Sequence, residues 1–232
     1  MKNSLIIFLS ISLLVVAAFT LQSCSCGSNS SPVVQDETTP PEYVDKNGVG
    51  YDTNEDGSLS VVSIPNSKDI TIPNTYKGME ITSIGKSSFK MSSAVTVTLP
   101  NTVKVIGEYA FAFSDNLKEI NIPQGVKEIG TNAFSGCTDL KSVKLPKSLK
   151  KIDIFAFDGS GLENIVIPEN VEEICDYAFA ECEMLSTVTF ECDKVSISDN
   201  AFNKSINVSF TAKKNSSAIG FAKTKGIEYA EK

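Results

Sequence analysis

The chain has 232 residues, of which 41% are hydrophobic and 21% are charged, and this balance is typical of a folded protein rather than a disordered one. It contains no histidine, which excludes active sites that pair a serine or cysteine nucleophile with an imidazole. Its formal net charge of −7 disfavours nucleic acid as a general partner.

The first residues are typical of an export signal. Lys2 is followed by an apolar run from Leu5 to Phe19 and then by small and polar residues. This run is shorter than the roughly 20 apolar residues that a membrane-spanning helix needs. We therefore expect residues 1–23 to be a signal peptide that is removed during export.

The end of this signal, Leu21-Gln22-Ser23-Cys24, resembles the bacterial lipobox. The resemblance implies cleavage before Cys24 and lipid attachment to this cysteine, with Cys26 as a second candidate. The alternative is an ordinary signal peptide followed by a serine-rich tail. Ser25, directly after the cysteine, is similar to the outer-membrane sorting pattern of lipoproteins. We expect an outer-membrane lipoprotein, exposed at the cell surface, that touches the membrane only through its lipid anchor.

Two segments separate the signal from the rest of the chain. Residues 24–41 are small, polar and proline-bearing, and predict a flexible tether. Residues 42–67 place apolar positions on either side of the turn-forming segment 52–57, and predict an N-terminal β-hairpin cap. The spacing of Asp52, Asn54 and Asp56 copies the first half of a calcium loop, but Ser63 stands where the closing glutamate belongs. A plain hairpin turn is the favoured interpretation.

A repeat with a period of about 22 to 23 residues organises positions 68–205. Every copy has an Ala-Phe or Ser-Phe pair, with the phenylalanine at Phe89, Phe111, Phe134, Phe157, Phe179 and Phe202. The small residue allows neighbouring coils to approach, and the phenylalanine fills the interior. Stacked coils therefore predict a continuous inner column of phenylalanine rings.

Each copy also contains two short apolar segments. The first, such as Ile120-x-Ile122, alternates like a strand with one buried face, and a following proline ends it. The second, such as Val126-x-x-Ile129, returns apolar side chains to the interior.

A glycine follows the second segment in the first three copies, at Gly85, Gly107 and Gly130, where we expect a left-handed backbone. Later copies place Asp153, Cys175 and Ser198 at this position, so glycine is not strictly required.

This pattern resembles the BspA-type (Treponema pallidum type) leucine-rich repeats over about residues 68–205. The resemblance implies a leucine-rich-repeat solenoid: a β-rich, right-handed stack of short parallel strands with tight helical turns, in about six repeats of 22–23 residues. We expect residues 206–232 to form a C-terminal cap, with a strand and a short helix near Ser216 to Lys225. Family members of this type are associated with attachment to host proteins or to other bacteria.

Four cysteines lie beyond the tether, at Cys137, Cys175, Cys182 and Cys192. Cys137 and Cys182 hold the same repeat position two coils apart, which places them roughly 9 to 10 Å apart and beyond disulfide reach. We expect buried roles as small hydrophobic residues. A zinc site is not predicted, because the repeats contain no Cys-x-x-Cys and the chain contains no histidine.

The charged residues suggest two candidate surfaces. One copy concentrates lysines and the next concentrates glutamates: Lys141, Lys144, Lys147, Lys150 and Lys151 against Glu163, Glu169, Glu172 and Glu173. Adjacent coils could gain weak exposed ion pairs in this way, or the lysines could form a patch for an acidic glycan or protein. The outward strand positions Thr98, Asn121, Lys144, Val166 and Thr189 form the second surface.

These observations favour a non-enzymatic, monomeric cell-surface lipoprotein that presents a leucine-rich-repeat surface for protein or glycan binding, as in adhesion. The alternative is a structural or scaffolding envelope lipoprotein without a host ligand. No catalytic residue, metal site or cofactor is predicted. The candidate functional residues are Cys24 for lipidation and Lys141, Lys144, Lys147, Lys150, Lys151 and Asn121 for binding.

Overall fold

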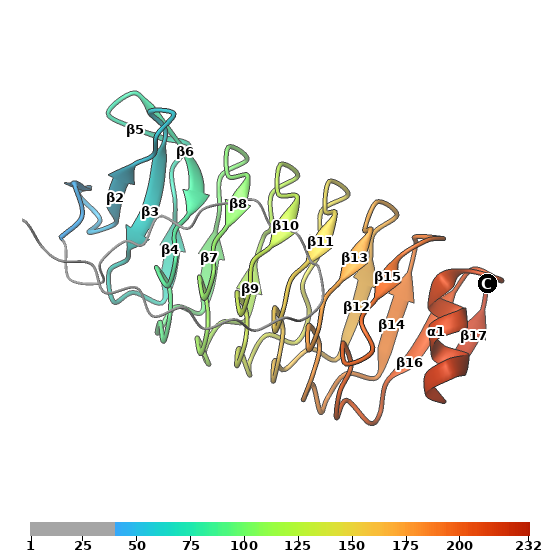
Figure 1. The fold of residues 1–232 in the computed structure, drawn as a ribbon. Helices are drawn as coiled ribbons and strands as arrows, with labels where there is room; N and C mark the ends of the chain where they lie inside the picture. The colour runs from blue at the N-terminus through green and yellow to red at the C-terminus, as the bar shows by residue number, and fades with distance from the viewer. Residues whose placement is uncertain (1–39) are drawn as a thin grey trace, which may run out of the picture. The chain divides into compact units, whose positions relative to one another are not determined.

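The structure, a computed structural model, describes residues 40–232, which form a single stack of coils (Figure 1). The predicted signal peptide, the lipidation candidates Cys24 and Cys26, and residues 24–39 of the predicted tether lie outside the described residues. The strands are β1 (Tyr43–Val44), β2 (Gly50–Thr53), β3 (Leu59–Ser63), β4 (Asp69–Thr71), β5 (Thr75–Tyr76), β6 (Met79–Ile84), β7 (Thr96–Thr98), β8 (Val105–Ile106), β9 (Glu119–Ile120), β10 (Glu128–Ile129), β11 (Lys151–Ile152), β12 (Asn164–Ile167), β13 (Glu173–Ile174), β14 (Thr187–Phe190), β15 (Ser196–Ile197), β16 (Ser209–Ala212) and β17 (Glu228–Glu231). One helix, α1 (Ser217–Lys225), lies between β16 and β17.

The second apolar segment of each copy builds the longest sheet. Its strands follow the order β1-β2-β3-β6-β8-β10-β11-β13-β15, and from β3 onward neighbouring strands on this path are parallel. The register aligns one isoleucine per coil, at Ile84, Ile106, Ile129, Ile152, Ile174 and Ile197. The prediction that this segment turns apolar side chains inward is confirmed. Its role as the main inter-coil ladder was not predicted.

The first apolar segment forms two shorter sheets instead of one continuous sheet. Strands β4, β7 and β9 pair on one side of a break, and β12, β14, β16 and β17 pair on the other. Among the described residues, the break falls at 141–146, where no strand forms. Val143 and Leu145 are nevertheless buried there, so the apolar pattern continues where the ladder does not.

The phenylalanine column is confirmed. Ring centroids of successive coils lie 4.6 Å apart for Phe89 and Phe111, 5.1 Å for Phe111 and Phe134, 5.2 Å for Phe134 and Phe157, 5.4 Å for Phe157 and Phe179, and 5.3 Å for Phe179 and Phe202. The last four of these contacts are stacked, with planes within 10° of one another. Each coil therefore buries its ring against its neighbours, and the coils stabilise one another in series.

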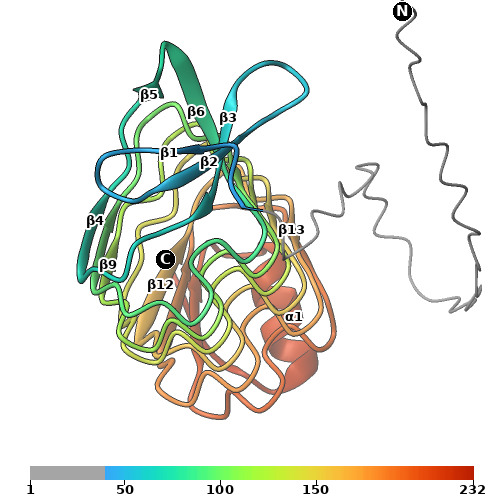
Figure 2. The ribbon, with the colours of Figure 1, turned by 90° about the vertical axis from the view of Figure 1, so that its left-hand side faces the viewer.

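The segments that carry the Ala-Phe pairs are tight turns with two kinds of hydrogen bond. In the third copy, the N–H groups of Ala133 and Ser135 donate to carbonyls of the same turn, those of Gly130 and Asn132. The N–H groups of Asn132, Phe134 and Gly136 donate to the next coil. This alternation satisfies the backbone N–H groups of each turn, both within its own coil and toward the next. Figure 2, which looks along the stack, shows how the successive coils lie over one another.

The expectation that Gly85, Gly107 and Gly130 adopt a left-handed backbone is wrong, because none of the three has a positive φ. The coils approach too closely at this position instead. A Cβ atom on Gly107 would lie 2.9 Å from the Ile84 carbonyl oxygen, and one on Gly130 would lie 2.7 Å from that of Ile106. The left-handed residues come two and six positions later in the copy.

The two ends of the stack are closed differently. At the N-terminal end, β2 and β3 form an antiparallel hairpin, and β3 continues as a parallel neighbour of β6. At the C-terminal end, β16 and β17 are parallel strands joined through α1, which the Ser216 side chain caps. The helix lies where the sequence indicated one.

Candidate functional site

The lysine-rich copy is largely neutralised by the next coil. Each of three lysines lies beside the glutamate that stands one repeat later in the chain: Lys141 Nζ is 3.3 Å from Glu163 Oε1, Lys147 Nζ is 3.6 Å from Glu169 Oε1, and Lys150 Nζ is 2.6 Å from Glu172 Oε1. All six side chains are exposed, so each pair contributes at most about 1 kcal/mol. This geometry favours inter-coil ion pairing over a basic patch.

Lys151 belongs to a half-buried network on the long sheet. Its Nζ lies 3.1 Å from Asp153 Oδ1 and 3.7 Å from Glu128 Oε1, and the Thr131 hydroxyl donates to Asp153 at 2.8 Å. Burial pushes the pKa of Asp153 upward, but the Ile154 backbone N–H, the Thr131 hydroxyl and Lys151 outweigh it and hold that pKa below its usual value. Burial raises the pKa of Glu128. These groups are committed to one another and are poorly placed to meet a ligand.

Lys144 differs from the other four lysines, since it forms no ion pair within residues 40–232 and is exposed. It lies at the break between the two shorter sheets. There a shallow hollow of about 420 Å³ is lined by Thr96, Val97, Thr98, Lys118, Glu119, Ile120, Asn121, Ser142, Val143 and Lys144. The structure thus brings Lys144 and Asn121 together on one face of the stack.

Asn121 has a structural role on this face. Its side-chain amide donates to the Leu99 carbonyl at 2.8 Å and accepts from the Leu99 N–H at 2.8 Å. The amide thereby prolongs the pairing of β7 and β9 by one residue. A ligand that used both polar atoms of Asn121 would have to break these bonds, so Lys144 is the more available of the two.

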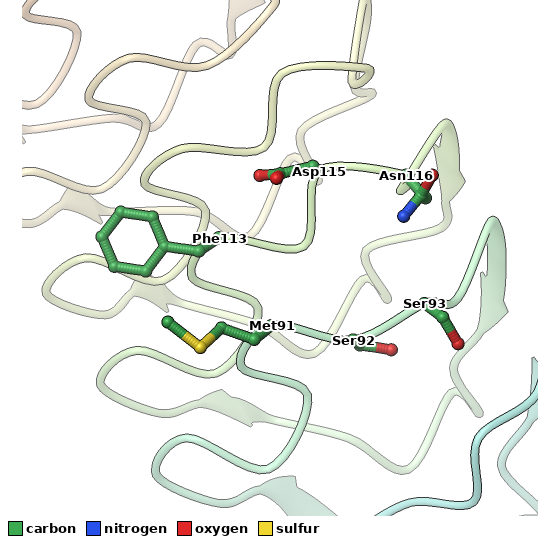
Figure 3. Close-up of a pocket in the computed structure, with 6 residues that line it drawn as sticks. All are labelled: Met91, Ser92, Ser93, Phe113, Asp115 and Asn116. Atoms are coloured by element: carbon green, nitrogen blue, oxygen red, sulfur yellow. The ribbon is translucent and has the colours of Figure 1, made fainter.

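A second hollow lies on the turn edge of the first two copies (Figure 3). It has a volume of about 350 Å³ and is lined by Met91, Ser92, Ser93, Phe113, Asp115 and Asn116. Met91 and Phe113 come from equivalent positions of adjacent coils and point the same way in Figure 3. They are 72% and 45% exposed, so two large apolar side chains from adjacent coils stand beside each other at the surface.

Sequence reasoning missed Met91 and Phe113, although a signal was present. Aligned on the Ala-Phe pair, the second residue after the phenylalanine is Met91, Phe113, Gly136, Gly159, Glu181 and Lys204 in successive copies. The column changes from apolar to glycine to charged, which marks an outward position whose side chain the fold does not dictate.

The four cysteines are buried thiols, as expected. Two of them act as weak donors: Cys137 Sγ and Cys182 Sγ lie 3.1 Å from the carbonyl oxygens of Phe111 and Phe157. Burial raises the pKa of Cys137 to about 12 and that of Cys182 to about 11, and neither is placed to act as a nucleophile.

In the hairpin segment with calcium-like spacing, the side chains of Asn54 and Asp56 form hydrogen bonds within the turn. The Asp56 carboxylate accepts from the backbone N–H and hydroxyl of Ser58, and the Asn54 amide donates to Ser58 at 2.9 Å. Among residues 40–232, no group of three or more Cys, Asp or Glu side chains is arranged to hold a metal ion. Nor does this part of the chain contain a helix long and apolar enough to cross a bilayer.

Stacked parallel coils with one inward phenylalanine each define a leucine-rich-repeat solenoid of the bacterial type. The BspA-type leucine-rich-repeat model matches residues 82–209 in six copies, so the chain belongs to this family. No similar protein was found among those with curated functions.

Solved bacterial structures share this fold. A leucine-rich repeat protein from Bacteroides ovatus is 30% identical with a TM-score of 0.62, and the match covers 74% of this chain and 53% of that protein. A Treponema pallidum leucine-rich repeat protein is 28% identical with a TM-score of 0.59, over 61% of this chain and 68% of its own length. The chain thus spans about half the length of the first relative and about two thirds of the second.

Proposed function

We propose that this chain is a non-enzymatic binding protein of the cell envelope, which presents its solenoid to a protein or glycan partner outside the cell, as in adhesion. The observation that carries this proposal is that each coil separates buried positions, which hold the stack together, from exposed positions. The phenylalanine, the apolar strand positions and the small residues of the turns are buried, and the exposed side chains stand at equivalent positions of neighbouring coils, so they form outward columns along the stack. Such columns give an extended surface in which substitutions have little effect on the fold.

The membrane attachment is proposed to be a lipid on Cys24. Metabolic labelling with a fatty-acid probe should mark the wild-type protein and its Cys26→Ala variant, and Cys24→Ala should lose the label. Labelling that survives Cys24→Ala but not Cys26→Ala would move the anchor to the second cysteine. A wild-type protein that takes up no label would remove the anchor from the proposal.

The proposed contact surface includes the strand face around Lys144, because this lysine keeps an unpaired charge beside the hollow. Binding of the full chain to acidic glycans and to extracellular matrix proteins should weaken in the double variant Lys144→Glu, Lys147→Glu. The matched control is Lys194→Glu, Lys214→Glu, which makes the same change of net charge at two exposed lysines outside the lysine-rich copy. Equal binding by all three proteins would exclude the lysines as the contact.

Surface display separates adhesion from a scaffolding role inside the envelope. If the chain is displayed, protease added to intact cells should degrade it while a periplasmic marker survives. Degradation only after the outer membrane is opened would favour the scaffolding alternative.

A further inference from the structure

Met91 and Phe113 occupy an unfavourable backbone conformation without the compensation of burial. Their φ angles are 56° and 58°, in the left-handed region that L-residues with large side chains rarely adopt. The coil dictates this conformation, because a left-handed residue recurs at the equivalent position of every copy. Here both side chains are largely exposed, so the interior gains little from their size.

The next two coils show that the fold does not need a side chain at this position. Gly136 and Gly159 adopt the same left-handed backbone, with φ of 69° and 61°. A Cβ atom on Gly159 would meet no atom within 4 Å, so the space outside is open. Glycine is the residue that the backbone favours there. Methionine and phenylalanine depart from it, as do Glu181 and Lys204 in the last two copies, with φ of 52° and 63°, but those two side chains form an ion pair with each other.

The pocket beside these side chains adds one uncompensated charge. The Asp115 carboxylate and the Asn116 amide line it and have no hydrogen-bond or ion-pair partner within residues 40–232. The Ser93 hydroxyl, in contrast, already donates to Asn66, and Ser92 Oγ accepts from the Ala94 N–H at 3.0 Å. The surface therefore presents two exposed apolar side chains, those of Met91 and Phe113, beside the Asp115 carboxylate, which has no partner among residues 40–232.

We propose that Met91 and Phe113 form a docking site for a protein partner. The segment that binds there presents an aliphatic or aromatic side chain next to a lysine or arginine. This inference rests on the proposed binding function and assigns it a surface that the lysine-rich copy does not share. The apolar side chain packs against the thioether and the ring, and the cation pairs with Asp115.

A protein segment fits this surface better than a sugar. One edge of the Phe113 ring lies against Gly136, where an added Cβ would be 2.6 Å from Cδ1, so the ring is not a fully open stacking platform. Met91 offers no flat face at all. Methionine and aromatic side chains with few charges are the composition of protein–protein contact centres.

The test is a selection from a displayed library of random peptides on the full chain. Peptides that pair an apolar residue with an adjacent lysine or arginine should be enriched. Their affinity should fall at least tenfold for the Met91→Gly, Phe113→Gly variant, and Asp115→Asn should weaken them and reduce their dependence on salt. The glycine variants copy Gly136 and Gly159, so they retain the fold, and an unchanged circular dichroism spectrum and unfolding midpoint verify this.

The matched control is Met184→Ser, Ile206→Ser, which removes two other exposed apolar side chains, 61% and 87% exposed, from elsewhere on the surface. It should leave peptide affinity unchanged. Enrichment of acidic peptides, binding that survives Met91→Gly, Phe113→Gly, or a glycan array whose hits require Phe113 would each overturn the proposal. None of these results bears on the proposed binding function outside the cell. That function is tested separately by the protease treatment of intact cells, and it is refuted if the chain is degraded only after the outer membrane is opened.

Discussion

Truncating Phe134 to alanine should be among the most damaging single changes in the repeats. The side chain is 0% exposed, and its ring stacks on Phe111 and Phe157 at 5.1 and 5.2 Å. A buried Phe→Ala change costs about 3 to 5 kcal/mol through lost transfer free energy and the remaining cavity. Two stacked ring contacts, each worth about 0.5 to 1.5 kcal/mol, place the expected loss of unfolding free energy in the upper part of that range.

Urea unfolding followed by circular dichroism measures this loss. The matched control is Phe155→Ala, which removes a half-buried ring whose one ring contact within residues 40–232 is with Tyr177 at 4.9 Å, and it should cost about 1 kcal/mol. Because each coil contacts only its neighbours, Phe134→Ala should also separate unfolding of the two halves into distinct transitions. A loss no larger than that of Phe155→Ala would refute the idea that the column holds the coils together.

Three further predictions concern individual contacts. Gly130→Ala should lower the urea midpoint, with a cost of about 1 to 3 kcal/mol, because its Cβ would collide with the preceding coil. Lys150→Glu should cost up to about 1 kcal/mol by placing like charges beside Glu172, whereas Lys144→Glu should cost almost nothing. Asp153→Asn should lower the melting temperature near neutral pH. The depressed pKa of Asp153 contributes stability that is full above the unfolded pKa of about 4 and is lost as pH falls through the lower folded pKa, so the gap between variant and wild type should close over that acidic range.

The inward side of the fold could be predicted because packing repeats it in every coil. The Ala-Phe pair recurs once per coil, and each phenylalanine meets the next in space at 4.6 to 5.4 Å. The error at Gly107 has a physical cause: close approach of two backbones and a left-handed backbone both select glycine, and sequence alone does not separate them. The break at 141–146 gave no signal, since Val143 and Leu145 keep the apolar alternation.

The charged residues of the candidate site could be located but not interpreted. The glutamates that pair with Lys141, Lys147 and Lys150 stand one repeat period later, and the period places them on the next coil. Whether two exposed charges at that spacing meet depends on side-chain directions that a period does not specify. Lys144 has no glutamate at the equivalent place in the next copy, because Val166 stands there, and this difference is visible in the sequence.

Outward positions reveal function only where they conflict with the fold. At an exposed position of the coil, a lysine is as compatible with the backbone conformation as a glutamate. The presence of a lysine there therefore carries little information about a partner. A phenylalanine in a left-handed turn, exposed to water and followed by glycine in the next two coils, does not satisfy the backbone as well as the alternative. Binding to a partner would offset the cost of that residue, and the docking proposal depends on this. The same comparison, made column by column along any solenoid of this kind, separates side chains that the stack requires from those that a partner requires.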